Sequence, residues 1–117
     1  MKVDGSCHCG HVTYEAEVDE KTVVICHCSD CQRMSASAYR VVAPTKEADF
    51  KLLNHPPKDY IKQSESGNPR VQAFCPECGS HIYATSVENV GERVFNIRLG
   101  SINQKADLTP TGQIWCR

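Results

Sequence analysis

The 117-residue chain is predicted to be all-β with one short helix, because most of its apolar residues recur with the two-residue period of strands. The clearest case is residues 11–18, where Val12, Tyr14 and Ala16 alternate with polar residues. With 40% hydrophobic residues the chain can bury a modest core, and its clustered cysteines can cross-link that core through metal ions. We therefore expect one metal-stabilised domain that covers residues 1–117.

In chain order, the predicted strands cover residues 11–18, 22–26, 39–43, 49–53, 59–63, 70–74, 81–85 and 93–99. Residues 29–36 are predicted to be helical, with Ser29 as the N-cap and Cys31 in the first turn. A polar loop is expected at 63–69 and a hairpin turn at 88–92.

Three cysteine clusters have the spacing of metal ligands: Cys7-His-Cys9, Cys26-His-Cys28-Ser-Asp-Cys31 and Cys75-Pro-Glu-Cys78. A closed tetrathiolate zinc site uses four cysteines, so these clusters supply one closed site and one site with three protein ligands. Cysteines one or two residues apart converge well on one ion but are poor disulfide partners. The chain begins without an apolar signal segment, so we expect a cytoplasmic protein with reduced thiols rather than a disulfide framework.

The first and last clusters form a natural structural site, which uses Cys7, Cys9, Cys75 and Cys78. The first pair precedes the first predicted strand, and the second pair lies in a turn where Gly79 can adopt the backbone angles of a zinc knuckle. Such a site would close a long loop of the chain. The alternative, in which Cys26 and Cys28 join the last cluster, uses equally suitable spacings and stays open.

The middle cluster is the candidate catalytic site, because Cys26, Cys28 and Cys31 leave one position open at a tetrahedral ion. A substrate thiol bound there would be held as the thiolate. The alternative is a closed and inert site. The candidates for a fourth protein ligand are Cys116, His8, His27 and His81. Of these, Cys116 would complete a second tetrathiolate site.

Four segments carry a family resemblance: Gly5-Ser-Cys7-His-Cys9-Gly10-His-Val12-Thr-Tyr14, Cys26-His-Cys28-Ser-Asp-Cys31-Gln-Arg33, Phe74-Cys75-Pro-Glu-Cys78-Gly79-Ser80 and Leu99-Gly100-Ser101-Ile102. In this order, and across nearly the whole chain, they resemble the glutathione-dependent formaldehyde-activating enzyme family, as does centromere protein V. The resemblance implies a β-tent of stacked antiparallel sheets and two zinc ions. It implies a structural zinc on Cys7, Cys9, Cys75 and Cys78, and a catalytic zinc on Cys26, Cys28 and Cys31.

The resemblance also implies an activity, a carbon-sulfur lyase that forms S-hydroxymethylglutathione from formaldehyde and the co-substrate glutathione. Formaldehyde and thiols combine unaided, so the alternative is a non-catalytic zinc-stabilised binding module or a carrier of glutathione or aldehyde. Arg33, Ser80 and Arg98 are candidate glutathione contacts, although a solvated arginine and a turn serine are the ordinary states of such residues. Tyr39 and Trp115 are candidate pocket residues.

The charge balance argues against large anionic partners. The formal net charge is −1 and the sequence pI is about 6.5, and only 7% of residues are aromatic. Nucleic-acid binding needs a basic surface, often with interleaved aromatic side chains, so we expect neither nucleic-acid nor membrane partners. The expected partners are a small thiol and an aldehyde, and a homodimer stays open.

Overall fold

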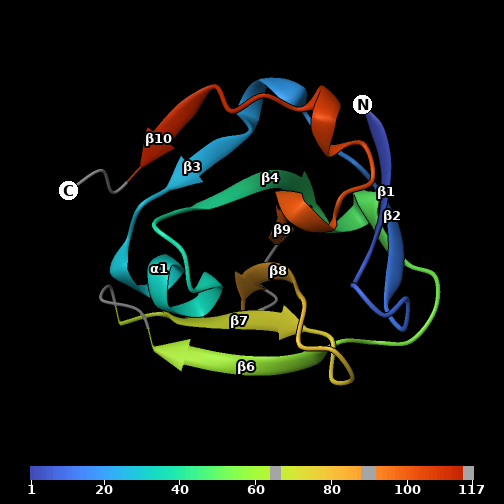
Figure 1. The fold of residues 1–117 in the computed structure, drawn as a ribbon, viewed down its shortest axis with the longest axis horizontal. Coiled ribbons are helices and arrows are strands. Elements are labelled where there is room, and N and C mark those ends of the chain that lie inside the picture. Colours follow the sequence, from blue (N-terminus) through green and yellow to red (C-terminus); the bar gives the residue numbers. More distant parts are fainter. Residues whose placement is uncertain (64–66, 88–91, 115–117) are drawn as a thin grey trace.

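The computed structural model describes residues 1–63, 67–87 and 92–114, and its mainly β architecture with one α-helix confirms the predicted fold class (Figure 1). The strands are β1 (Lys2–Ser6), β2 (Thr13–Glu17), β3 (Val24–Cys26), β4 (Arg40–Lys46), β5 (Phe50–Leu52), β6 (Lys58–Gln63), β7 (Pro69–Phe74), β8 (His81–Ser86), β9 (Val94–Arg98) and β10 (Gly112–Ile114). The helix is α1 (Ser29–Ser35), and the short 3-10 helices are η1 (Glu20–Thr22), η2 (Glu47–Asp49), η3 (Leu99–Ser101) and η4 (Lys105–Asp107). In these ranges no helix is long and apolar enough to cross a membrane.

The strands form two sheets. One has three strands in the order β1-β2-β5, and the other has seven in the order β10-β3-β4-β9-β8-β7-β6. Figure 1 shows β1 and β2 on one side of the molecule and α1 on the other. Neighbouring described strands pair antiparallel, as expected, except that β10 pairs parallel with β3. This parallel pair was not predicted, because it depends on a return of the distant C-terminal segment rather than on a local hairpin.

An aromatic cluster joins the two sheets. Tyr14 and Phe50 come from the three-stranded sheet, and Tyr83 and Phe95 come from the seven-stranded sheet. The rings of Tyr14 and Phe50 lie 5.1 Å apart between centroids, and those of Tyr83 and Phe95 lie 4.5 Å apart. Phe50 also contacts both rings of the larger sheet. The buried, alternating side chains predicted for residues 11–18 are thus part of the core between the sheets.

Two strands were missed by the sequence analysis, namely β1 and β10. Each is short, and β1 has Val3 as its one buried apolar side chain, so neither shows the alternation that marks a strand. The presence of β1 corrects one prediction. Cys7 and Cys9 do not precede the first strand but lie in the loop between β1 and β2.

Four predictions lie wholly or partly outside the described residues. These are the middle of the polar loop at 63–69, most of the hairpin turn at 88–92, and the proposed roles of Trp115 and Cys116.

Candidate metal centres and the adjoining cavity

The structure brings four cysteine sulfurs together at one end of the β1–β2 loop: those of Cys7, Cys9, Cys75 and Cys78. All four lie within 4.8 Å of one another. The Sγ atoms of Cys7 and Cys9 are 3.7 Å apart, and those of Cys9 and Cys75 are 3.8 Å apart. Thiolates bound to a tetrahedral zinc ion at about 2.3 Å lie about 3.8 Å from one another. The cluster therefore fits a metal ion of this kind.

Both cysteine pairs sit in tight loops that end in a glycine with positive φ. The values are +82° at Gly10 and +79° at Gly79, a region in which other residues are strained. In the second loop the amide of Gly79 donates to the carbonyl of Cys75 at 2.8 Å, and the amide of Cys75 donates to the carbonyl of Ser80 at 2.8 Å. These bonds turn the chain sharply enough to aim two thiols at one point, as the sequence analysis expected for Gly79.

Hydrogen-bond donors face several of these sulfurs. The amide of Val12 donates to Sγ of Cys7 at 3.3 Å. The hydroxyl of Ser80 lies 3.2 Å from Sγ of Cys78, and this hydrogen bond is the main cause that lowers the pKa of Cys78 to about 5. A backbone hydrogen bond lowers the pKa of Cys9, but burial and the neighbouring thiols outweigh it and raise that pKa to about 12. Thiols this close do not all ionise together without a cation to balance them.

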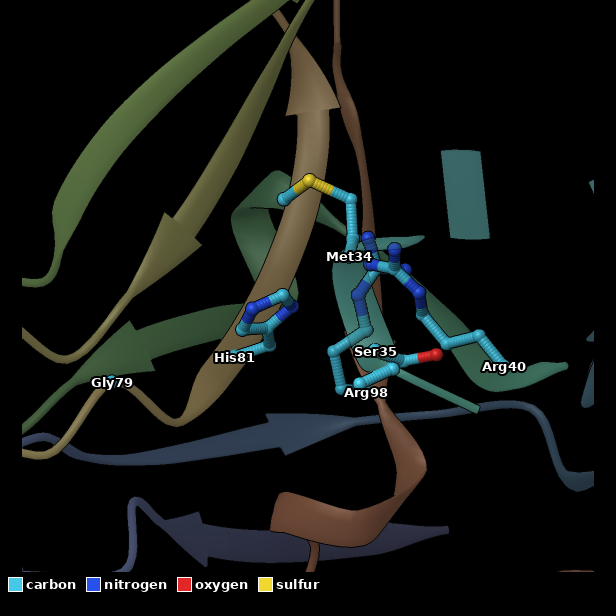
Figure 2. Close-up of a pocket in the computed structure, with 7 residues that line it drawn as sticks. Met34, Ser35, Arg40, Gly79, His81 and Arg98 are labelled. Carbon is cyan, nitrogen blue, oxygen red and sulfur yellow. The ribbon is translucent and has the colours of Figure 1, made fainter. Parts of the chain in front are cut away.

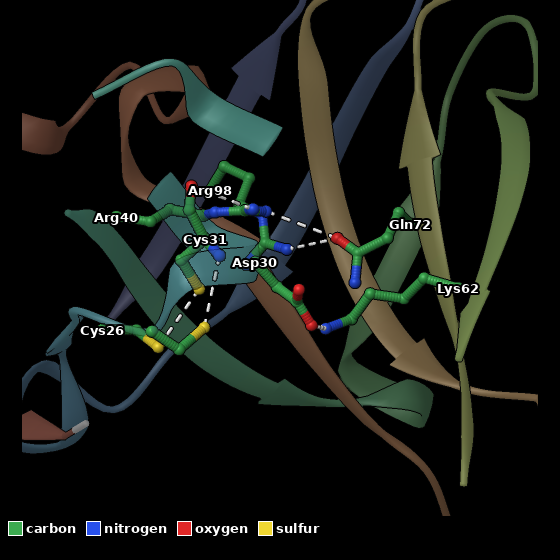
Figure 3. Close-up of polar contacts among 8 residues, drawn as sticks. Cys26, Asp30, Cys31, Arg40, Lys62, Gln72 and Arg98 are labelled. Carbon is green, nitrogen blue, oxygen red and sulfur yellow. Dashed lines mark hydrogen bonds and ion pairs between the residues drawn. The ribbon is translucent and has the colours of Figure 1, made fainter. Parts of the chain in front are cut away.

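The second cluster is built where β3 runs into α1. Cys26 ends β3, Cys28 is the N-cap of α1, and Cys31 lies in the first turn. Sγ of Cys31 lies 3.1 Å from Sγ of Cys26, and the amide of Cys31 donates to Sγ of Cys28 at 3.2 Å (Figure 3). The predicted cap was Ser29, which is wrong by one residue, because the thiol of Cys28 accepts the bond that a serine hydroxyl would ordinarily accept.

The thiols of this cluster also have opposed acidities. Burial, and then the thiols of Cys28 and Cys26, raise the pKa of Cys31 to about 12. Burial opposes ionisation of Cys28 too, but hydrogen bonds from Cys31 and Cys26 and the charge of Lys62 lower its pKa. Cys28 therefore ionises more readily than an ordinary thiol, and Cys31 ionises less readily. A bound dication would stabilise the state in which all three thiols are ionised.

Among the described residues, no fourth metal-ligating side chain joins Cys26, Cys28 and Cys31. The ring of His27 points elsewhere, since its Nε2 lies 2.7 Å from Oε1 of Gln113. His8 and His81 are not part of the group, and Cys116 is outside the described residues. The alternative grouping of Cys26 and Cys28 with the last cysteine pair is not the one that the structure has.

A cavity of about 350 Å³ is lined by residues that follow each cysteine cluster in the sequence, together with Arg40, His81 and Arg98 (Figure 2). It is lined by Met34, Ser35, Ala36, Arg40, Gly79, His81 and Arg98. The first three follow Cys31 on α1 and at its C-cap, and Gly79 belongs to the loop that holds the four-cysteine cluster. Arg40 starts β4 and donates from its guanidinium to the carbonyl of Cys31 at 3.5 Å. A molecule in this cavity would therefore contact residues that follow Cys31 on α1 and the arginine that hydrogen-bonds to its carbonyl.

Two buried arginines form one wall of the cavity. Arg40 is 6% exposed and Arg98 is 9% exposed, so the expectation of a solvated Arg98 is wrong. Both guanidinium groups donate to Oε1 of Gln72, at 3.4 Å from Arg40 and 2.8 Å from Arg98 (Figure 3). Burial, together with the charge of Arg40, lowers the pKa of Arg98 to about 9. The same causes, burial and the two guanidinium charges, lower the pKa of His81.

The other described residues that the sequence analysis predicted to contact glutathione or to line a pocket do not line this cavity. Arg33 is exposed on α1 and does not line the cavity. Ser80 hydrogen-bonds at the four-cysteine cluster, where its Oγ also accepts from the amide of His8 at 3.1 Å. Tyr39 is 48% exposed and its ring lies 5.8 Å from that of His27. Arg40 was missed by the sequence analysis, because nothing local distinguishes it from a surface arginine.

The fold and these sites define a mainly β protein with two cysteine clusters that can hold metal ions. The family model of the glutathione-dependent formaldehyde-activating enzyme matches residues 2–117, so the chain belongs to that family, as the sequence motifs indicated. A crystal structure of a Rhodobacter sphaeroides protein has a similar fold, with a TM-score of 0.68 and 21% sequence identity over 94% of this chain and 98% of that chain. No curated protein matches the chain.

Proposed function

We propose that the chain is a zinc-dependent carbon-sulfur lyase that forms S-hydroxymethylglutathione from formaldehyde and glutathione. The observation that carries the proposal is the three-cysteine cluster of Cys26, Cys28 and Cys31. The hydrogen bond that Arg40 donates to the carbonyl of Cys31 connects this cluster to the wall of a cavity of about 350 Å³. Membership of a formaldehyde-activating family supports it. In this proposal two zinc ions bind, a structural one at the four-cysteine cluster and a catalytic one at the three-cysteine cluster.

Three thiolates leave one tetrahedral position for a thiol, and the cavity wall can orient the rest of the molecule. A zinc ion there would keep the incoming thiol ionised and polarise the aldehyde oxygen.

His81 is placed to carry the proton that the reaction moves from the thiol to the aldehyde oxygen. In the reaction the sulfur bonds to the aldehyde carbon, the carbonyl electron pair moves to oxygen, and the thiol proton ends on that oxygen. His81 lines the cavity, and because its pKa is lowered it is neutral at neutral pH. A neutral imidazole can accept a proton at one ring nitrogen and donate one in turn, so His81 is the proposed proton carrier.

The test is the rate of adduct exchange, because formaldehyde and glutathione already combine unaided. NMR exchange spectroscopy on an equilibrium mixture would measure that rate with the zinc-loaded protein and without it. We expect acceleration by the native chain and by Ser29→Ala, a neighbouring substitution outside the cluster, and none by Cys28→Ser. Glutathione binding without acceleration by the native chain would contradict the lyase and assign a carrier or binding module instead.

A further inference from the structure

Arg40 and Arg98 are the buried charged side chains of the described residues, and they lie side by side (Figure 2). Each is more than nine-tenths buried. The ion pairs in the described part of the chain use other groups, and neither arginine takes part in one. Two like charges in contact inside a protein repel each other and are poorly solvated, so an arrangement of this kind calls for a counter-charge.

The hydrogen bonds of the pair are also incomplete. Nε of Arg40 and Nε of Arg98 are buried without any hydrogen-bond partner. The side-chain acceptor that the two share is the neutral amide oxygen of Gln72. Guanidinium groups bind most strongly to planar oxyanions, which accept several N–H groups at once. Both side chains line the cavity, so a ligand can reach them.

The nearby acidic side chain is already engaged. Asp30 on α1 forms an ion pair with Lys62 at 2.6 Å (Figure 3). On the other side, Arg40 donates to the carbonyl of Cys31, which carries no formal charge. The thiol cluster can supply part of the counter-charge, but it does not satisfy the two Nε–H groups.

We propose that Arg40 and Arg98 form an oxyanion-binding subsite in the wall of the cavity, which takes a carboxylate or phosphate group of the ligand. This rests on the proposed function and deepens it, because it names the acidic group that a ligand of the same cavity must carry and the two residues that bind it. The subsite selects ligands that carry an acidic group and fit the cavity. Neutral thiols and neutral aldehydes of the same size are bound less tightly.

The direct test observes the two unpartnered donors. The ¹H–¹⁵N signals of arginine Nε–H groups are followed in the zinc-loaded full chain during titration with sodium acetate, and separately with inorganic phosphate. Chloride at matched ionic strength is the control for screening. We expect the signals of Arg40 and Arg98 to shift together and saturably, while that of Arg93, which is paired with Glu47, stays in place. The stronger of the two oxyanions identifies the class of acidic group.

Two variants separate binding from a structural role. Arg98→Gln should weaken oxyanion affinity by about tenfold or more, the loss of a charge-assisted hydrogen bond, and should keep the zinc content unchanged. Gln72→Glu places a carboxylate between the two guanidinium groups, so it should weaken oxyanion binding by a similar factor and raise the melting temperature. Arg93→Gln is the matched control and should bind the oxyanion as the native chain does.

The proposal is overturned if neither oxyanion shifts the two Nε–H signals of the native chain beyond the chloride control. It is also overturned if Arg98→Gln releases zinc and leaves oxyanion affinity unchanged, since the pair would then serve only to balance the thiolates. The titration of the native chain tests the oxyanion subsite even if a variant does not fold. Failure here leaves the exchange measurement on formaldehyde and glutathione unaffected, so the two proposals fail separately.

Discussion

Cys28 combines two roles in one side chain, because its sulfur caps α1 and also belongs to the three-cysteine cluster. A serine at this position keeps an oxygen that can cap the helix but is a poor zinc ligand. We therefore expect Cys28→Ser to lower the bound zinc from two ions per chain to one, with little change in the fold. Zinc measured by atomic emission, with circular dichroism as the check on folding, tests this.

The control for that experiment is Ser29→Ala, which should retain both zinc ions. If Cys28→Ser also retained both, the sulfur of Cys28 would not be a ligand. The assignment of the middle cluster as an open metal site would then be wrong.

Gly5 marks a close approach of β1 to the core. A Cβ atom at this position would overlap the ring of Tyr14 and the carbonyl oxygen of Ser101. These two residues are fixed relative to each other, because their side-chain hydroxyls are hydrogen-bonded at 2.7 Å. Gly5→Ala should therefore destabilise the fold by about 1–3 kcal/mol through overpacking. Urea unfolding measures this change in the free energy of unfolding.

Gly112→Ala is the matched control, because a Cβ there meets Val24 at an ordinary contact of 3.7 Å. Equal stability of Gly5→Ala and the native chain would show that β1 does not pack against Tyr14 as described.

At the scale of elements, Glu47 and Arg93 connect η2 to the start of β9. Nε and Nη2 of Arg93 donate to the two carboxylate oxygens of Glu47 at 3.1 and 2.8 Å. This paired hydrogen bonding is the main cause that lowers the pKa of Glu47 from its ordinary value of 4.5. A lowered pKa means that the ionised form stabilises the folded state.

The pH dependence follows from the direction of that shift. The contribution of Glu47 is fully present above the pKa of the unfolded chain, and it is lost as the pH falls from about 4.5 through the lower folded value. Glu47→Gln should therefore be less stable than the native chain at pH 7, and the difference should shrink as the pH falls toward 3. Unfolding curves at several pH values check this, with Glu20→Gln on exposed η1 as the control. A difference that stayed constant with pH would contradict the pairing.

Elements with a strong local pattern were predictable from the sequence, and short strands without one were not. The alternation in residues 11–18 and 93–99 and the β-branched run at 22–26 correctly indicated β2, β9 and β3. The strands β1 and β10 are short and have little local pattern. β1 pairs with the next strand, β2, whereas β10 pairs with β3, which lies far away in the sequence.

At the scale of the whole molecule, the same distinction applies to the candidate site. The three cysteine clusters could be predicted as metal ligands, because ligand spacing is a local property, but spacing alone left open which clusters share an ion. The buried pair of Arg40 and Arg98 could not be predicted, since their contact requires β4 and β9 to pair and Gln72 on β7 to face them. Local sequence gives no sign that an arginine will lose its contact with water.

The fold explains why the two clusters can serve different purposes. The four-cysteine cluster joins the β1–β2 loop to the turn between β7 and β8, which connects the two sheets. The three-cysteine cluster uses only the short segment from β3 to α1, so it cross-links little, and the residues that follow it on α1 line a cavity. In the proposed function the four-cysteine cluster stabilises the fold and the three-cysteine cluster meets the ligand.

The central claim is that the three-cysteine cluster holds a metal ion with a position open to a thiol. The most direct measurement replaces zinc by cobalt and follows the thiolate-to-cobalt charge-transfer absorption during titration with glutathione. We predict a saturable increase as a fourth sulfur binds, and no increase with S-methylglutathione, whose sulfur cannot become a thiolate. An absorption spectrum that stays unchanged at saturating glutathione would contradict the account.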